Sequence, residues 1–408
     1  MSFTSYEMRD TFTLMAKRSA GYDVVIVGGA IIGSAVAYFL TADEDFQGRV
    51  LVIEKDPSYQ YCSTTRSLAS IRQQFSTPVN IHLSQFGVEF LRTVKDRLGA
   101  DVEVSFREAG YLLLASEQGK AVLDHNAGVQ TRQGADVCLL GPAELQARFP
   151  WLATSDLAAG CLGLSGEGWF DAHSLLYALR NTAVARGAEF LTGEVVGLHV
   201  ARQRLESVQL ADGRVFSCGE LVNAAGPAAG KIARMADIEL PVESRKRCVF
   251  VFDCRQAGAL QPCPLVVDVS GVYFRPEGQY FVCGVSPPAD QDPPTEDFRV
   301  EYQLFDEIVW PALAHRVPIF EAIKQVSAWS GHYAYNTLDQ NAIVGRHPVI
   351  TNFLFVNGFS GHGVQQAPGV GRGIAELIVH GAYRTIDISP LGFERVIASR
   401  PLQELNVI

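Results

Sequence analysis

The stretch Asp23-Val-Val-Ile-Val-Gly-Gly-Ala-Ile-Ile-Gly33 decides the fold of the chain. Its branched apolar residues predict a buried strand at 23–27, a glycine turn follows, and a helix is expected at about 31–42. A second apolar strand at 49–54 completes a βαβ unit of a parallel sheet. The uncharged run 24–42 is about long enough to cross a bilayer, but its glycines favour a strand, a turn and a helix.

The glycine turn carries a dinucleotide-binding pattern. Gly28 and Gly33 match the first and third glycines of G-x-G-x-x-G, which permit a tight turn and close strand–helix packing below a pyrophosphate. Glu54 ends the second strand about 20 residues later, where a carboxylate accepts hydrogen bonds from a ribose. Ala30 departs from the pattern, because its methyl group lies where the backbone should approach the phosphates. The residues expected to bind the dinucleotide are Gly28, Gly29, Ala30, Ile31, Ile32, Gly33, Glu54 and Lys55.

This pattern leaves two alternatives open. A plain glycine-rich turn has the same spacing, and the pattern alone does not choose between a nicotinamide and a flavin dinucleotide.

The rest of the chain alternates between two kinds of segment. Further elements of a nucleotide-binding domain are a helix at 171–187, strands at 189–200, 204–211, 221–226, 326–330 and 353–356, and a final helix from about Pro368 to His380. Strands are expected at 102–115 and 241–285, and helices at 79–98 and 296–324. This order predicts an α/β protein, α+β overall, in which a Rossmann-like domain is interleaved with an antiparallel β-sheet domain. The predicted segments are 21–94, 151–240 and 326–390 for the nucleotide-binding domain, 95–150 and 241–325 for the second domain, and 1–20 for an N-terminal extension.

Composition narrows the function classes. The formal charge of −10 does not suit a nucleic-acid partner. The eight cysteines form no C-x-x-C pair, and neither H-E-x-x-H nor G-x-S-x-G occurs, so no metal site is expected. Residues 1–20 mix acidic and basic side chains without the apolar core of a signal peptide. We therefore expect a cytoplasmic chain without a transmembrane segment.

Four motif blocks together resemble a known family. They are the fingerprint through Glu54, the segment Cys62-Ser-Thr-Thr-Arg-Ser-Leu-Ala-Ser-Ile-Arg-Gln-Gln-Phe75, the segment Val222-Asn-Ala-Ala-Gly226, and a late block containing Tyr335-Asn-Thr-Leu-Asp339 and Gly358-Phe-Ser-Gly-His-Gly363. The chain resembles the D-amino-acid oxidase/sarcosine oxidase superfamily of FAD-dependent oxidoreductases. Its late block is similar to the branch that contains the mitochondrial FAD-dependent oxidoreductase domain protein linked to complex I assembly.

The resemblance implies that the Rossmann-like domain binds FAD and that the antiparallel β-sheet domain binds the substrate. The hydroxyls and the arginine after Glu54 suit pyrophosphate oxygens, although an ordinary capped turn is the alternative. The late glycines let N–H groups approach a ring edge, and the following helix favours the negative charge of a reduced flavin. The additional residues expected to bind FAD are Ser63, Thr64, Arg66, Ser67, Ser70, Val195, Ala225, Gly226, Gly331, Gly358, Ser360, Gly361, His362, Gly363, Val364 and Gln365.

Candidates for catalysis and substrate binding rest on the same resemblance. Arg72 lies in a segment that runs under the flavin in sarcosine-oxidase relatives, and Tyr273 matches a tyrosine of their substrate pocket. Arg275 could pair with a substrate carboxylate, or it could be a surface arginine. The remaining candidates are His332, Tyr333 and His362, and each histidine has a structural role as its alternative.

The implied activity is oxidation of the C–N bond of an amino acid or a secondary amine, giving an imine that hydrolyses. The flavin-facing lysine of monomeric sarcosine oxidases is missing at Phe281-Val282-Cys283, which favours a dehydrogenase over an oxidase, so the electron acceptor is oxygen or a respiratory carrier. Non-covalent FAD is expected, because His332 stands where relatives carry a flavin-linked cysteine. A nicotinamide-dependent dehydrogenase and an FAD-stabilised, non-catalytic assembly factor are the alternatives.

Overall fold

The computed structural model describes residues 21–405, so the extension expected at 1–20 lies outside the described residues. Two large sheets, each of eight strands, form two halves of the molecule, and the chain passes between them repeatedly. The predicted α/β class, α+β overall, with a Rossmann-like part interleaved with an antiparallel sheet, is confirmed.

The first sheet contains the fingerprint strand. Its members are β1 (Tyr22–Val27), β2 (Val50–Glu54), β8 (Glu189–Thr192), β9 (Val195–Ala201), β10 (Arg204–Leu210), β11 (Val215–Asn223), β17 (Ile343–Arg346) and β18 (Phe353–Asn357). In the order β17-β18-β11-β1-β2-β8, all strands except β17 run parallel. Strands β9 and β10 form a hairpin, and a turn at Asp212 and Gly213 leads from β10 antiparallel into β11.

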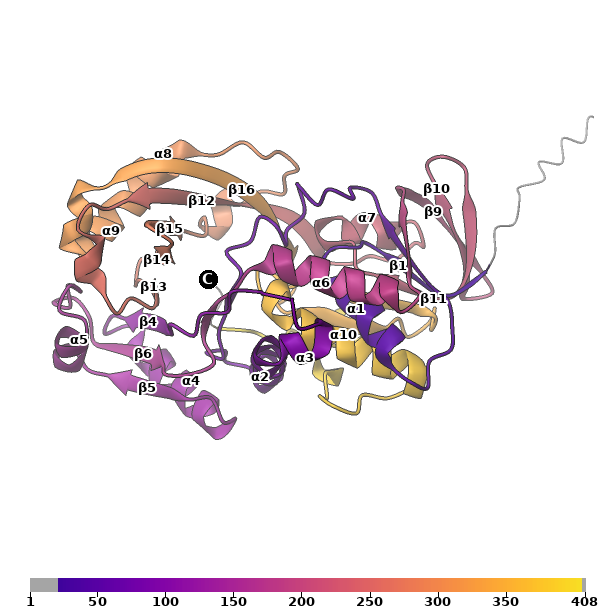
Figure 1. The fold of residues 1–408 in the computed structure, drawn as a ribbon, viewed down its shortest axis with the longest axis horizontal. Helices are drawn as coiled ribbons and strands as arrows, with labels where there is room; N and C mark the ends of the chain where they lie inside the picture. Colours follow the sequence, from indigo (N-terminus) through magenta and orange to yellow (C-terminus); the bar gives the residue numbers. More distant parts are fainter. Residues whose placement is uncertain (1–20, 406–408) are drawn as a thin grey trace, which may run out of the picture.

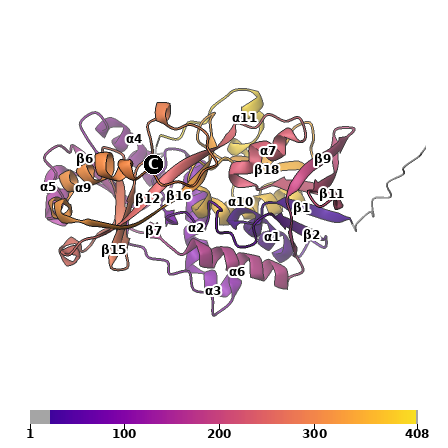
Figure 2. The same ribbon diagram turned by 90° about the horizontal axis from the view of Figure 1, so that it is seen from above.

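Both faces of this sheet are covered, which explains the unbroken apolar run of β1. Val24 and Ile26 pack in the core under the helices α1 (Ile31–Ala42), α2 (Pro78–Arg92), α6 (Ala172–Ala185) and α10 (Gly363–His380). Val25 and Val27 lie in the opposite core, with the β9–β10 hairpin and α7 (Ala229–Arg234). Figure 2 shows α6 and α7 on opposite sides of β1.

The second sheet is antiparallel except where β4 meets β13. Its order is β16-β12-β15-β14-β13-β4-β6-β5, with bounds β4 (Tyr111–Ala115), β5 (Val137–Leu140), β6 (Ala159–Gly163), β12 (Val242–Asp253), β13 (Leu265–Val267), β14 (Tyr273–Glu277), β15 (Tyr280–Gly284) and β16 (Lys324–Asn336). Phenylalanines of one face pack against the short helices α8 (Tyr302–Leu304) and α9 (Trp310–Arg316) and the turns beside them. The other face, which carries Tyr111 and Tyr273, is turned to the rest of the molecule.

Smaller elements join the two halves. Figure 1 shows the sheets at opposite ends of the long axis, with α2 between them. Strands β3 (Ser70–Ile71) and β7 (Gly168–Trp169) form a two-stranded ribbon. The remaining helices are α3 (Val94–Leu98), α4 (Lys120–Arg132), α5 (Pro142–Arg148) and α11 (Glu394–Ile397).

Several expected elements differ from the observed ones. The boundaries predicted at 151 and 326 assign β6 and β16 to the nucleotide-binding domain, but both strands pair within the second sheet. The strand expected at 189–200 is two strands, and the helix expected at 296–324 is only α8, α9 and short turns. The helix α4 lies within 95–150, the segment that was expected to belong to an antiparallel β-sheet domain. Sheet membership depends on long-range pairing partners, which local periodicity does not report.

Among residues 21–405, no helix has the length and apolar character needed to span a bilayer.

The crossing of β1 and α1 gives the first testable prediction. A Cβ atom on Gly33 would lie 1.9 Å from the carbonyl oxygen of Gly28, which is part of the turn itself. We expect Gly33→Val to force α1 away from β1 and to abolish FAD retention, measured as the flavin-to-protein absorbance ratio of the purified protein. Normal flavin content in this variant would refute the fingerprint assignment. Gly258→Ala is the control, because Gly258 is exposed, a Cβ atom there meets nothing within 4 Å, and its φ is not positive.

Candidate active site

The N-terminus of α1 opens toward the carboxyl end of the parallel strands. Gly28 has φ +100°, and a Cβ atom on it would lie 2.4 Å from the carbonyl oxygen of Ala224. Ala30 is the N-cap residue and provides no side-chain hydrogen bond, and the first turn contains no acidic residue. The Ile31 N–H reaches the Thr64 hydroxyl at 3.4 Å, and the N-terminus of α1, with no capping bond from Ala30, remains suited to an anion.

Glu54 lies beside this turn. Its Oε2 accepts a hydrogen bond of 2.8 Å from the Gly29 N–H, and its Oε1 accepts one of 2.9 Å from the Asp56 N–H. The carboxylate is thus held at the end of β2, where the fingerprint places a ribose. Lys55 is exposed, and Val195 is buried at the start of β9. The contacts of these two residues with FAD remain predictions.

The hydroxyl groups of segment 62–67 point to different parts of the molecule, either to the α1 turn or to strand β16. Thr64 is buried, and its Oγ1 lies 3.4 Å from the Ile31 nitrogen, at the α1 turn. Ser63 donates a 2.6 Å hydrogen bond to the His332 carbonyl, and Ser67 Oγ accepts one from the Ala69 N–H. Only Thr64 of these hydroxyls reaches the fingerprint turn in this structure. Ser70 begins β3 and is half-buried.

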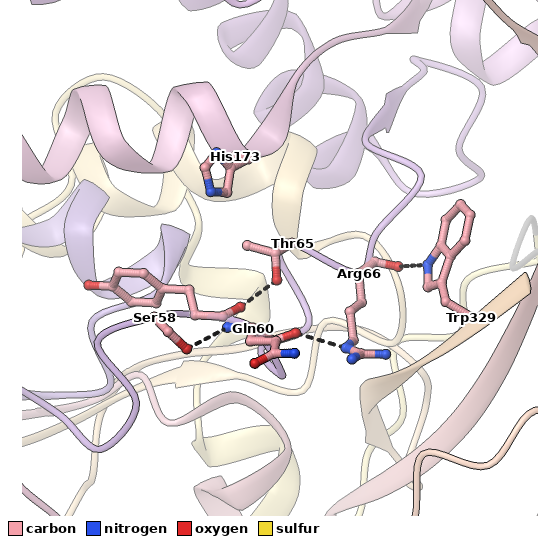
Figure 3. A pocket seen from close by; sticks show the side chains of 7 residues that line it. Ser58, Gln60, Thr65, Arg66, His173 and Trp329 are labelled. Carbon is pink, nitrogen blue, oxygen red and sulfur yellow. Dashed lines mark hydrogen bonds between the residues drawn. The ribbon is translucent and has the colours of Figure 1, made fainter.

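Arg66 does not point to the expected pyrophosphate position. Its guanidinium donates to the carbonyls of Gln60, at 2.9 Å, and Ser330, at 2.7 Å. Arg66 lines a pocket of about 420 Å³ together with Trp329 and His173, at the start of α6 (Figure 3). Gly331 lies against Arg66, since a Cβ atom on Gly331 would be 2.9 Å from the Arg66 Cβ. A local sequence pattern could not indicate this orientation, because the carbonyl partner lies on the distant strand β16.

The strand β11 ends in a backbone turn that can accept a ligand. Ala225 donates its N–H to the Asn223 side chain at 3.2 Å, and Gly226 has φ +55°. A Cβ atom on Gly226 would meet nothing within 4 Å, so this backbone borders open space. The position agrees with close approach of a cofactor to the expected residues 225 and 226.

A second helix N-terminus opens next to the first. After β18, Gly358, Ser360 and Gly361 adopt positive φ angles of 73°, 49° and 99°. Helix α10 begins at Gly363, with His362 as an N-cap that makes no side-chain capping bond. The N–H groups of Gly363, Val364 and Gln365 therefore occupy the first turn, where a helix favours negative charge.

The expected helix start at Pro368 is wrong. Pro368 lies inside α10, where it removes the hydrogen bond that residue 368 would donate to the carbonyl of Val364. Proline is common in the first turn of helices, which suggested the later start.

His362 and Arg72 form a buried pair at this second N-terminus. The Arg72 NH2 group lies 3.2 Å from His362 Nε2, and the Arg72 N–H donates to Gln365 Oε1 at 2.9 Å. A guanidinium only donates, so His362 Nε2 accepts and its lone pair is occupied. Burial, together with the charge of Arg72, lowers the pKa of His362 to about 3. His362 is therefore neutral and is not a base at Nε2.

A cluster of three tyrosines from the second sheet, of which Tyr111 and Tyr273 are buried and Tyr333 is half-buried, faces this end of the site. Tyr111, Tyr273 and Tyr333 come from β4, β14 and β16, and burial raises the pKa of each above its ordinary value. A Cβ atom on Gly361 would lie 2.6 Å from the Tyr333 ring, so the tyrosine side touches the glycine turn. All three phenols are neutral at physiological pH.

Arg247 on β12 joins the tyrosine cluster. Its guanidinium lies 4.9 Å from the centre of the Tyr333 ring and is held by Asp292 through two bonds of 2.8 and 2.9 Å. Its buried Nε atom has no hydrogen-bond partner among the described residues. Sequence reasoning did not select Arg247 or Tyr111; the basic run 245–247 at the start of an apolar strand was the available signal for Arg247.

Two of the predicted site residues, His332 and Arg275, are held by groups outside the tyrosine cluster. The ring of His332 packs 4.2 Å from that of Phe298, and its Nε2 lies 2.8 Å from the Asp297 carbonyl. Because strand neighbours point to opposite faces, His332 faces away from the side that Tyr333 occupies. Arg275 shares the face of Tyr273, but its guanidinium binds the Leu68 carbonyl at 2.9 Å and the exposed Glu277.

Glu167 fixes the backbone after Arg72. Its buried carboxylate accepts hydrogen bonds from the Gln73 N–H at 2.6 Å, the Gln74 N–H at 3.1 Å and the Gln74 side chain at 2.8 Å. Burial outweighs these bonds and raises the pKa of Glu167 to about 7. Sequence reasoning missed this residue, because a lone glutamate in a loop gives no local signal.

Comparisons with known proteins agree on one family. A family model described as FAD dependent oxidoreductase (DAO) matches residues 23–377. The FAD-dependent oxidoreductase domain-containing protein 1 of Bos taurus is 43% identical over 97% of this chain and 88% of its own length. Mitochondrial sarcosine dehydrogenase of Mus musculus is 26% identical over 88% of this chain and 40% of its own length. The crystal structure of L-proline dehydrogenase from P. horikoshii has a TM-score of 0.83 at 26% identity, covering 93% of this chain and 99% of that chain.

The raised pKa of Glu167 predicts a pH-dependent stability. The folded protein holds this proton more tightly than the unfolded chain, whose carboxyl has a pKa near 4.5, so the contribution is full below about pH 4.5 and is lost as pH rises through 7. The unfolding free energy of the parent should decrease between pH 5 and 7.5. In Glu167→Gln we expect this decrease to be smaller by up to about 3 kcal/mol. Urea unfolding across this range measures it, and identical slopes in both proteins would contradict it.

Proposed function

The chain belongs to the DAO family of FAD-dependent oxidoreductases, and from this premise we propose that it oxidises the C–N bond of an amino acid or a secondary amine. Family membership also decides the choice that the fingerprint leaves open, in favour of FAD rather than a nicotinamide cofactor. The observation that carries the proposal is the sheet face of Tyr111, Tyr273, Tyr333 and Arg247, whose Tyr333 ring lies against the glycine turn at Gly361.

The residues present fit FAD at both ends. Two helix N-termini without side-chain caps, those of α1 and α10, lie at the same edge of the parallel sheet. The first suits the pyrophosphate, and the second suits the flavin edge that becomes negative on reduction. The open backbone at Gly226 suits the part of FAD that links the pyrophosphate to the flavin ring. The carboxylate of Glu54 suits the adenosine ribose.

Bound FAD supplies the acceptor, at N5, for the hydride that leaves the carbon next to the substrate nitrogen. The protein has to bind the substrate as a neutral amine, orient that carbon and exclude water. No residue of the cluster is a ready base, because the three phenols are neutral and His362 Nε2 accepts from Arg72. This arrangement suits hydride transfer, which requires no proton to be taken from carbon.

Arg247 is proposed to bind the substrate carboxylate. Its buried Nε–H has no partner among residues 21–405, while its NH1 and NH2 groups bind Asp292 and the Lys246 carbonyl. Arg275 Nε is also without a partner among these residues, but Arg247 is the arginine whose guanidinium lies over the Tyr333 ring. Names of relatives support carboxylated amines, since sarcosine, dimethylglycine and 4-methylaminobutanoate are all N-methylated amino acids.

An acceptor other than oxygen is proposed. Val282 pairs with Arg275 and so lies on the Tyr273 face of the second sheet. At this position, where monomeric sarcosine oxidases resemble one another in carrying a lysine, the side chain is apolar. A dehydrogenase that passes electrons to a carrier fits this face better than an oxidase.

The activity itself is testable without knowledge of the acceptor. We expect at least one of sarcosine, dimethylglycine, 4-methylaminobutanoate, L-proline and glycine to bleach the FAD absorption of the holoprotein under anaerobic conditions, as hydride transfer reduces the flavin. A dye acceptor should then support faster turnover than oxygen. If no amine of the panel, extended to D- and L-amino acids, bleaches the flavin, the non-catalytic alternative of an FAD-stabilised assembly factor gains and the enzyme proposal fails.

Substitution of Arg247 and of Arg275 tests which of the two binds the substrate carboxylate. We expect Arg247→Lys to raise KM for a carboxylated substrate roughly 10- to 100-fold, the value of a lost charged hydrogen bond, and to spare the ion pair with Asp292. Arg275→Lys is the matched control on the same sheet face, and its KM should stay within about threefold of the parent. The opposite pattern would assign the carboxylate to Arg275, as the sequence suggests.

A further inference from the structure

The C-terminal tail delivers a buried carboxylate to the first turn of α2. Glu404 is 4% exposed. Its Oε1 accepts from the Ser76 N–H at 2.6 Å and the Ser76 hydroxyl at 2.7 Å. Its Oε2 accepts from the Thr77 N–H at 3.2 Å, the Thr77 hydroxyl at 2.8 Å and the Asn80 amide at 3.1 Å. These five donors hold the carboxylate against Ser76 and Thr77, which lead into α2, and against the Asn80 side chain of its first turn.

The segment that Glu404 binds is next to the Arg72–His362 pair, and Phe75 connects the two. The Arg72 guanidinium lies 4.1 Å from the centre of the Phe75 ring, and the His362 ring meets Phe75 edge-on at 5.0 Å. Phe75 is thus in contact with both members of the pair and precedes Ser76 in the chain. A displacement of Ser76 would move the aromatic surface on which Arg72 rests.

The charge of Glu404 also acts on this pair. Burial lowers the pKa of Arg72 and that of His362, and the Glu404 carboxylate opposes both shifts. The other titratable groups around Arg72 are the buried Glu167 and the neutral phenols of Tyr111 and Tyr333. Because the pKa of Glu167 is near 7, Glu404, whose pKa is lowered by its donors, is the acid that stays ionised at neutral pH.

The tail is anchored independently of Glu404. Asp339 accepts from Arg395 at 2.8 Å and from the Leu402 N–H at 2.9 Å. Asn336 donates its amide to Asp339 and its N–H to Ser360, in the glycine turn. The Asn-Thr-Leu-Asp block found in the sequence therefore ties the tail to the same turn that Arg72 and His362 approach.

We propose that Glu404 is a positioning residue, which holds Arg72 and His362 at the N-terminus of α10 and supplies the negative charge that balances Arg72 beside the flavin. This inference rests on the placement of the FAD ring at the glycine turn. Removing the charge of Glu404 leaves Arg72 less compensated, so the surroundings of the ring become more positive and favour its reduced, negative form.

The test uses the FAD-loaded full chain and needs no amine substrate. Glu404→Gln keeps the shape and one acceptor oxygen but removes the charge, and we expect an upward shift of the flavin midpoint potential, measured by stepwise reductive titration with an indicator dye. Glu404→Asp restores the charge and should return the potential toward that of the parent. Gln403→Ala, at the exposed neighbouring position, should leave it unchanged.

The outcomes divide clearly. An unchanged potential in FAD-loaded Glu404→Gln overturns the proposal. An equal shift, or an equal loss of FAD, in the Gln and Asp variants also overturns it, because Glu404 would then act only as a structural hydrogen-bond acceptor. Loss of FAD in the Gln variant alone, with the parent potential in the Asp variant, supports the need for the charge. Failure of the amine panel to bleach the parent protein leaves this measurement intact, so the two proposals fail separately.

Discussion

Close contact between α1 and α10 is the constraint on which the site depends. A Cβ atom on Gly371 would lie 2.8 Å from the Ala35 Cβ and 2.9 Å from the Ala35 carbonyl carbon, so the two helices meet at their smallest side chains. Their preceding strands, β1 and β18, flank β11 in the parallel sheet. Both helix N-termini therefore open at one edge, and their positive ends lie close enough to serve one extended, doubly anionic ligand.

The chemistry of the site follows from which groups stay charged in this buried setting. Burial keeps the tyrosines of the second sheet and His362 neutral, while Arg72 and Arg247 remain cations because guanidinium groups hold their protons. Such a site offers donors and fixed positive charge but no strong base. It can stabilise an anionic reduced ring and orient a carboxylated amine, and it is poorly suited to proton abstraction from carbon.

The parts of the fold that the sequence predicts are those determined by neighbours along the chain. The strand 23–27, the glycine turn and the helix after it depend on local sterics, and a Cβ atom at Gly33 would collide with Gly28 in the same βα unit. The direction of Arg66 and the opposite faces of His332 and Tyr333 depend on the register of β16 against β12. That register is set by residues about 90 positions away, as in the pairing of His332 with Lys246. For the same reason the position of Glu404 could not be read from its neighbours in the sequence.

The strand β16 explains why two interleaved parts behave as one site. It is an edge strand, and an edge presents unpaired carbonyl groups that must be satisfied. Its alternate carbonyls at 330, 332 and 334 accept hydrogen bonds from Arg66, Ser63 and Ser360, which belong to the two loops expected to surround FAD. The FAD-binding loops thus complete the edge of the sheet that carries Tyr333. A displacement of either loop would break hydrogen bonds of that edge, so the substrate face and the cofactor face hold a fixed distance from each other.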